Sequence, residues 1–151
     1  MTVTEQGFSI IEFILIIIIV SIISLVGIMA IKSPSDTVID LAARKVAYDM
    51  GFIRERAMAS SKTHKIYINI PDRFRAGFGN YTLITNPENN SPFDVRISKN
   101  YPGVTFFKNY SVQFDPLGRG KFVNVTSITL ESASKSKNIK IVPYTGKIYV
   151  Q

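Results

Sequence analysis

Residues 10–31 read IIEFILIIIIVSIISLVGIMAI, and this apolar stretch decides how the rest of the chain can be organised. Its only charged residue is Glu12. A helix rises about 1.5 Å per residue, so a run of this length matches a hydrocarbon core of about 30 Å. The stretch therefore predicts a single transmembrane helix at residues 8–32, ahead of a polar and basic remainder.

Glu12 is the one residue that a simple membrane anchor does not explain. A carboxylate at the centre of a bilayer costs on the order of 2.5–3.5 kcal/mol, and less near the end of a helix. One interpretation is that Glu12, close to the start of the run, reaches water at the interface. The other is that another group pairs with it, and the residues alone leave both open.

Length and composition limit what the remainder can be. The chain has 151 residues, which leaves roughly 120 residues for one core-forming domain. The absence of Cys excludes disulfides, thiolate metal sites and a Cys nucleophile. The chain has 18 basic and 11 acidic residues, and setting aside Lys32, Glu5 and Glu12 leaves 17 against 9, or +8. Such an excess suits anionic partners, and it is also ordinary for a solvated surface.

An amphipathic helix is predicted at residues 33–61. Ser35 and Asp36 offer capping side chains, and a kink is expected at Ser33-Pro34. Apolar residues then recur at steps of three and four, which is the spacing of one helix face. These residues are Ile39, Ala43, Val46, Met50, Ile53 and Ala57.

From Lys65 the apolar residues alternate, which predicts strands in a β-rich head at residues 62–151. The first strand contains Ile66 and Ile68, and the others are predicted at 81–85, 94–98, 104–108, 111–114, 122–131, 138–142 and 147–150. Loops are expected at 75–80 and 86–92, and an exposed turn at 132–137. The expected fold class is α+β, a long N-terminal helix packed against an antiparallel domain of seven or eight strands.

The start of the chain, Gly7-Phe8-Ser9-Ile10-Ile11-Glu12, resembles the processing site of type IV pilins and type II secretion pseudopilins. The resemblance implies a leader at residues 1–7, cleavage after Gly7 by a prepilin peptidase, and N-methylation of Phe8. It also implies an assembly role for Glu12, whose carboxylate would neutralise the Phe8 amine of another subunit and set the axial register. Two groups that are costly alone in a membrane become tolerable as a pair.

Three further segments are similar to the minor pseudopilin H and to FimT-like minor pilins. They are Arg54-Glu55-Arg56-Ala57, Phe114-Asp115-Pro116-Leu117-Gly118-Arg119-Gly120 and Thr145-Gly146-Lys147. The resemblance implies a pilin-like structural subunit without enzymatic activity or cofactor, anchored in the bacterial inner membrane by one span. Its head would lie in the periplasm or on the cell surface, and its partners would be other subunits of a secretion, pilus or competence system.

The chain carries no basic residue before the apolar run, so the orientation of the span is also implied by the resemblance. DNA is the alternative partner, because FimT-like proteins serve in DNA uptake. The basic C-terminal third supplies possible phosphate contacts at Arg119, Lys121, Lys140 and Lys147, with Lys135 and Lys137 nearby.

Catalytic patterns are missing from the sequence. The only histidine, His64, falls at the predicted helix-to-strand junction, where we expect a solvated loop residue. No Gly-x-Ser-x-Gly elbow accompanies it, and Gly77-Phe78-Gly79 indicates a turn. The sequence therefore predicts no catalytic residue and no metal site.

Overall fold

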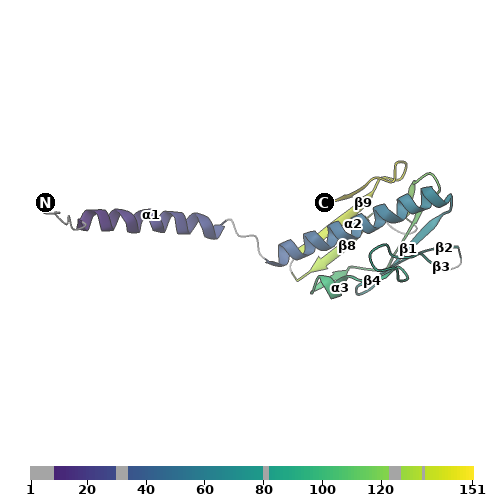
Figure 1. Cartoon of the computed structure of the whole chain (residues 1–151), viewed down its shortest axis with the longest axis horizontal. Helices are drawn as coiled ribbons and strands as arrows, with labels where there is room; N and C mark the ends of the chain where they lie inside the picture. The colour runs from purple at the N-terminus through teal and green to yellow at the C-terminus, as the bar shows by residue number, and fades with distance from the viewer. Residues whose placement is uncertain (1–8, 30–33, 80–81, 123–126, 134) are drawn as a thin grey trace, which may run out of the picture. The chain divides into compact units, whose positions relative to one another are not determined.

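The computed structural model describes residues 9–29, 34–79, 82–122, 127–133 and 135–151 (Figure 1). The chain divides into two compact units, Met1–Ser33 and Pro34–Gln151, which are described separately. Gly7 and Phe8, with the predicted cleavage and methylation, lie outside the described residues, and so does Ser33 of the predicted kink.

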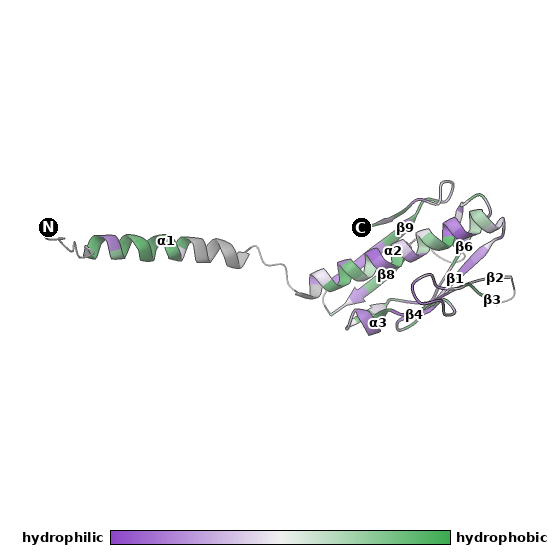
Figure 2. Ribbon diagram, viewed as in Figure 1, coloured by the Kyte–Doolittle hydropathy of each residue, from purple (hydrophilic) through white to green (hydrophobic). Residues whose placement is uncertain are grey.

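The first unit contains α1 (Ile10–Met29). The backbone N–H groups of Glu12 and Phe13 donate to the carbonyl of Ser9, which closes the first turn. All side chains of residues 10–22 are exposed within this chain, and the coloured part of α1 in Figure 2 is hydrophobic apart from a hydrophilic position near its start. Over the residues that the structure describes, no helix is long and apolar enough to cross a membrane.

The second unit begins with α2 (Pro34–Ser60), which confirms the helix predicted there. Proline suits the first position of a helix because its missing N–H would have no partner there. The helix ends in a Schellman motif: Ser61 has a φ of 52°, its N–H donates to Met58, and the N–H of Lys62 donates to Ala57. The six apolar residues predicted to share a face are all buried: Ile39, Ala43, Val46, Met50, Ile53 and Ala57.

A six-stranded sheet forms one wall of this unit. Its strands are β1 (His64–Asn69), β2 (Arg73–Phe78), β3 (Thr82–Leu83), β4 (Asp94–Arg96), β6 (Tyr110–Phe114) and β7 (Gly120–Phe122). The order is β3-β2-β1-β6-β7, and β4 also pairs with β2. Alternate residues such as Ile66, Phe74 and Val112 are buried, so the sheet has one core face and one outer face.

A four-stranded sheet of order β10-β9-β8-β5 completes the unit. It consists of β5 (Val104–Phe106), β8 (Ser127–Ser132), β9 (Lys135–Ile141) and β10 (Ile148–Val150), and a short α3 (Ile97–Asn100) precedes β5. The helix α2 packs against strands of both sheets and runs along β8 and β9 in Figure 1. All strand pairs among the described residues are antiparallel, which confirms the α+β class with antiparallel strands. The described residues form ten strands, where seven or eight were expected.

Four local predictions were wrong. The loop expected at 75–80 belongs largely to β2, whose Phe74 and Ala76 are buried between arginines. The turn expected at 132–137 is shorter, because Lys135 already begins β9 with its polar side chains facing outward. The strand expected at 122–131 is not one strand, since Phe122 belongs to β7 of one sheet and Ser127 begins β8 of the other, while residues 123–126 lie outside the described residues.

His64 is the fourth. It lies at the predicted junction, but its side chain is 2% exposed, not solvated. Its Nδ1 lies 2.9 Å from the carbonyl oxygen of Lys62, and its ring packs beside Phe78 with centroids 5.7 Å apart. His64 is the first residue of β1 whose side chain faces the core. Its burial is explained by a polar neighbour for the ring nitrogen and an aromatic neighbour for the ring face.

Candidate functional site

Glu12 lies in the first turn of α1 and its side chain is exposed. The start of a helix favours a carboxylate, because unpaired N–H groups give this end a partial positive charge. No ion pair joins Glu12 to another described residue of the chain. Its pairing with a second subunit stays a prediction.

Arg54 of α2 joins the two turns that the sequence singled out. Its Nε donates to the carbonyl oxygen of Gly118 at 3.0 Å, and its Nη2 donates to the carbonyl oxygen of Thr145 at 3.0 Å. The three motif segments thus meet at one junction, although 64 and 91 residues separate the partners in the chain. We call this arrangement the Arg54 junction.

Asp115 organises the first of these turns. Its Oδ1 accepts hydrogen bonds from the backbone N–H groups of Leu117 and Arg119, both at 2.9 Å, and its Oδ2 lies 2.6 Å from Arg119 Nε. Desolvation alone would raise the pKa of Asp115, but the hydrogen bonds from Arg119 and Leu117 outweigh it and lower the pKa. The carboxylate is therefore committed to holding its own turn.

Two glycines allow the turns to approach each other. Gly118 and Gly146 have positive φ values of 73° and 62°, a region that favours glycine. A Cβ atom on Gly146 would lie 1.9 Å from the carbonyl oxygen of Gly118 and 2.8 Å from Arg54 Nε. Backbone cannot yield as a flexible side chain does, so a larger residue at 146 would separate the turns.

A hollow of about 560 Å³ lies beside the junction, and it brings together two of the four basic residues predicted to contact DNA. Arg119 and Lys121 line it, with the exposed ring of Tyr144 and with Asp115. The other two do not line it: Lys140 is on β9, opposite Tyr149 of β10, and Lys147 precedes β10.

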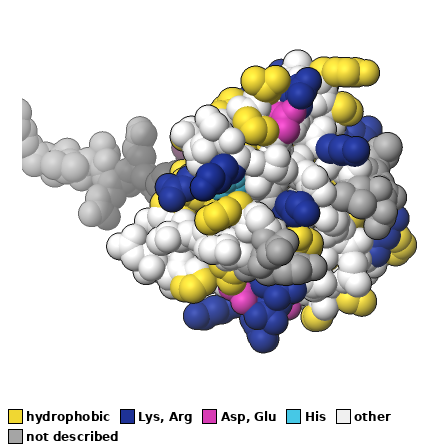
Figure 3. Space-filling model, turned by 90° about the vertical axis from the view of Figure 1, so that its right-hand side faces the viewer, with side chains coloured by type: hydrophobic (Ala, Val, Ile, Leu, Met, Phe, Trp, Pro, Cys, Tyr) yellow, Lys and Arg dark blue, Asp and Glu magenta, His cyan; other side chains and the backbone are white. Residues whose placement is uncertain are grey.

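Several basic side chains are already neutralised by carboxylates. Arg119 pairs with Asp115, and two lysines of β9 pair with α2: Lys135 with Asp36, and Lys137 with Asp40 at 3.3 Å. The sequence analysis missed these helix-to-strand pairs. Lys135 and Lys137 are two residues apart on a strand, and Asp36 and Asp40 are four apart on a helix, so each pair lies on one face of its element. This spacing was the signal in the sequence that could have predicted the contacts. On the face drawn in Figure 3, Lys and Arg side chains form several separate groups, not one patch.

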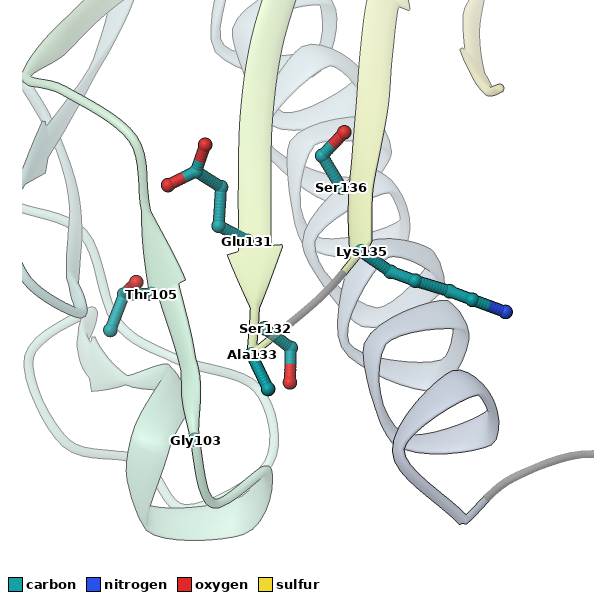
Figure 4. A pocket seen from close by; sticks show the side chains of 7 residues that line it. All are labelled: Gly103, Thr105, Glu131, Ser132, Ala133, Lys135 and Ser136. Carbon is teal, nitrogen blue, oxygen red and sulfur yellow. The ribbon is translucent and has the colours of Figure 1, made fainter.

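A second hollow, of about 480 Å³, lies at the β8–β9 turn (Figure 4). Thr105, Glu131 and Ser136 line it from three neighbouring strands, and Lys135 extends away toward its ion pair with Asp36. Among the described residues, no group of three or more His, Cys, Asp or Glu side chains could hold a metal ion. Glu131 therefore stands as a single carboxylate in a polar surface.

Comparison with protein-family models, with curated proteins and with solved structures finds no significant match to this chain.

Replacing Gly146 by Ala should destabilise the folded chain by about 2–4 kcal/mol, because the new methyl group meets backbone and the residue has a positive φ. Urea unfolding of the full chain, followed by circular dichroism, measures the change. The matched control is Gly51→Ala in α2, where a Cβ atom meets nothing within 4 Å. That variant should be about 0.5–1 kcal/mol more stable than the original chain. Equal stability of the two variants would contradict the close approach at the Arg54 junction.

Proposed function

We propose that this chain is a structural subunit of a pilus-like or secretion filament, a minor pilin or pseudopilin, that assembles through its N-terminal helix. It is made with a leader at residues 1–7, is cut after Gly7, carries a methylated Phe8, and is held in the inner membrane before assembly. The head built from residues 62–151 then projects from the filament, carried by α2.

The observation that carries this proposal is the exposed apolar surface of α1. Every side chain of residues 10–22 is exposed in the isolated chain, and nearly all are Ile, Leu, Val or Phe. A helix that is apolar all round is stable only where apolar material surrounds it. A bilayer can supply this before assembly, and the same helices of neighbouring subunits can supply it afterwards.

The position of Glu12 adds a reason for ordered assembly. Transfer of the Glu12 carboxylate into a bilayer or a bundle of apolar helices costs free energy unless a positive group neutralises it. The amine created on Phe8 by cleavage is near it in sequence, so the same group on an adjacent subunit can meet Glu12 at a fixed axial offset. Such an ion pair stabilises one axial register between neighbouring subunits over the others.

The motifs of the head support a structural role. Arg54, Gly118 and Gly146 hold two turns against α2, and Asp115 is bonded within its own turn. These groups stabilise the end of the head at which α2 ends. A filament subunit needs a rigid head on its helix, and the Arg54 junction supplies such a connection.

Mass spectrometry of the chain extracted from membranes of cells with an active prepilin peptidase should find a mature N-terminus at methylated Phe8. The same chain from cells without the peptidase is the control, and it should retain residues 1–7. An intact Met1 in the presence of the peptidase would overturn the processing proposal.

Replacing Glu12 by Ala should leave membrane insertion intact and reduce incorporation into filaments by about tenfold or more, since the register contact is lost while the membrane cost falls. Membrane fractionation measures insertion, and quantification of the chain in sheared filaments measures incorporation. Ser21→Ala is the control, because Ser21 Oγ bonds the carbonyl of Ile17 one turn away on the same helix. Normal incorporation of Glu12→Ala would restore the interpretation that Glu12 reaches interfacial water.

DNA binding is the second candidate, and the hollow beside Arg119, Lys121 and Tyr144 is the observation that favours it. Basic side chains contact phosphates, and an exposed aromatic ring can stack on a base. The charge available there is small, because Arg119 already pairs with Asp115.

If this candidate holds, the full chain in detergent should bind duplex DNA with an affinity that falls steeply with salt. The double variant Arg119→Gln, Lys121→Gln should lose most of that binding, as measured by fluorescence anisotropy at two salt concentrations. Arg44→Gln on α2 is the control, since Arg44 pairs with Asp40 away from the hollow. Absence of binding at low salt would eliminate DNA as a partner.

A further inference from the structure

Three arginines gather on the outer face of the six-stranded sheet. Phe74 of β2 is buried, so its neighbours Arg73 and Arg75 lie on the opposite face. The register places Arg73 between Asn69 of β1 and Arg96 of β4. Two arginines on adjacent strands are therefore direct neighbours, an arrangement in which like charges destabilise a sheet.

The next row along the strands contains Arg75 and Asp94, which are direct partners in the register. Asp94 nevertheless reaches diagonally to Arg73, with Nε to Oδ1 at 2.9 Å and Nη2 to Oδ2 at 2.5 Å. The hydrogen bond from Arg73, with the charges of Arg73, Arg75 and Arg96, lowers the pKa of Asp94 despite some desolvation. Asp94 is thus an ionised partner of Arg73, and no ion pair joins Arg75 or Arg96 to another described residue.

Arg75 is only partly satisfied. Its Nη2 donates to Asn69 Oδ1 at 2.9 Å, whereas its Nε is buried and has no hydrogen-bond partner among the described residues. A buried N–H without a partner is costly, and more so when it belongs to a charged group. Asn69 uses its oxygen for Arg75, which leaves its amide NH₂ as a further donor.

These side chains line one hollow of about 390 Å³, which is large compared with the roughly 30 Å³ that a water molecule occupies in the liquid. Asn69, Arg73, Arg75 and Arg96 line it, together with the turn between β1 and β2. Asp72 lines it too, but this residue is buried and its carboxylate accepts a hydrogen bond from Ser98. The lining therefore holds three guanidinium groups and one carboxylate, Asp72, while Asp94 pairs with Arg73, so an excess of positive charge is left.

We propose that this hollow binds a tetrahedral oxyanion, a phosphate or a phosphate ester, held by Arg75 and Arg96 with Arg73 and Asn69 at its edge. Such an anion offsets the repulsion between Arg73 and Arg96 and accepts hydrogen bonds from Arg96 and from the terminal nitrogens of Arg75, the two arginines of the hollow that no ion pair joins to another described residue. Planar guanidinium groups suit this ligand because each donates two parallel hydrogen bonds to neighbouring oxygens. The site is distinct from the hollow beside Arg119 and does not depend on the filament proposal.

The test is calorimetric titration of the full chain in detergent with inorganic phosphate, against sodium chloride of equal ionic strength. Phosphate should bind with saturation at one site. Arg75→Gln and Arg96→Gln should each weaken the affinity by about tenfold or more, because each removes a charged pair of donors. The matched control is Arg56→Gln, which removes the same charge from an exposed position on α2 and should leave the affinity unchanged.

Arg96 is exposed on a short strand, so Arg96→Gln decides the outcome if Arg75→Gln does not fold. Glycerol 3-phosphate identifies the source of the ligand: binding equal to that of phosphate supports a free ion, and tighter binding supports an ester. The proposal is overturned if phosphate does not saturate the original chain, if Arg96→Gln binds as the original does, or if acetate binds as tightly as phosphate.

Discussion

The buried face of α2 is the constraint on which the second unit depends. Six apolar side chains, from Ile39 to Ala57, are almost wholly removed from solvent, and strands of both sheets pack against the helix that carries them. Neither sheet is closed into a barrel, so each needs a cover for its apolar face. A single helix of 27 residues provides one cover for both, which explains why its apolar stripe continues over most of its length.

Polar contacts then fix how the helix meets the strands. Near the start of α2, Asp36 and Asp40 pair with Lys135 and Lys137 of β9, and near its end Arg54 binds the carbonyls of two turns. The hydrophobic effect is not directional, whereas these hydrogen bonds and ion pairs form at only one axial position of the helix and therefore stabilise that position. They also engage Lys135 and Lys137 of the basic C-terminal third, which leaves fewer of its positive side chains free to contact a polyanion.

The surfaces not used by this core are where function is to be sought. On α1 the exposed surface is apolar, which suits assembly with other helices, and on the outer face of the six-stranded sheet it is cationic and partly unsatisfied. The two surfaces call for different partners. An apolar helix is stabilised by other apolar groups, whereas neighbouring arginines are stabilised by an anion.

The sequence by itself determined the elements whose pattern is local. The steps of three and four identified α2 and its buried face, the alternation after Lys65 indicated strands, and the apolar run from Ile10 indicated the helix α1. Only the tertiary structure decided which strands pair. It placed β4 beside β2, and so brought Arg96 next to Arg73 although 23 positions separate them. It also brought Gly146 against Gly118 and Arg54. Such neighbours follow from strand register and helix packing, which depend on the whole core, so no local spacing in the sequence could show them.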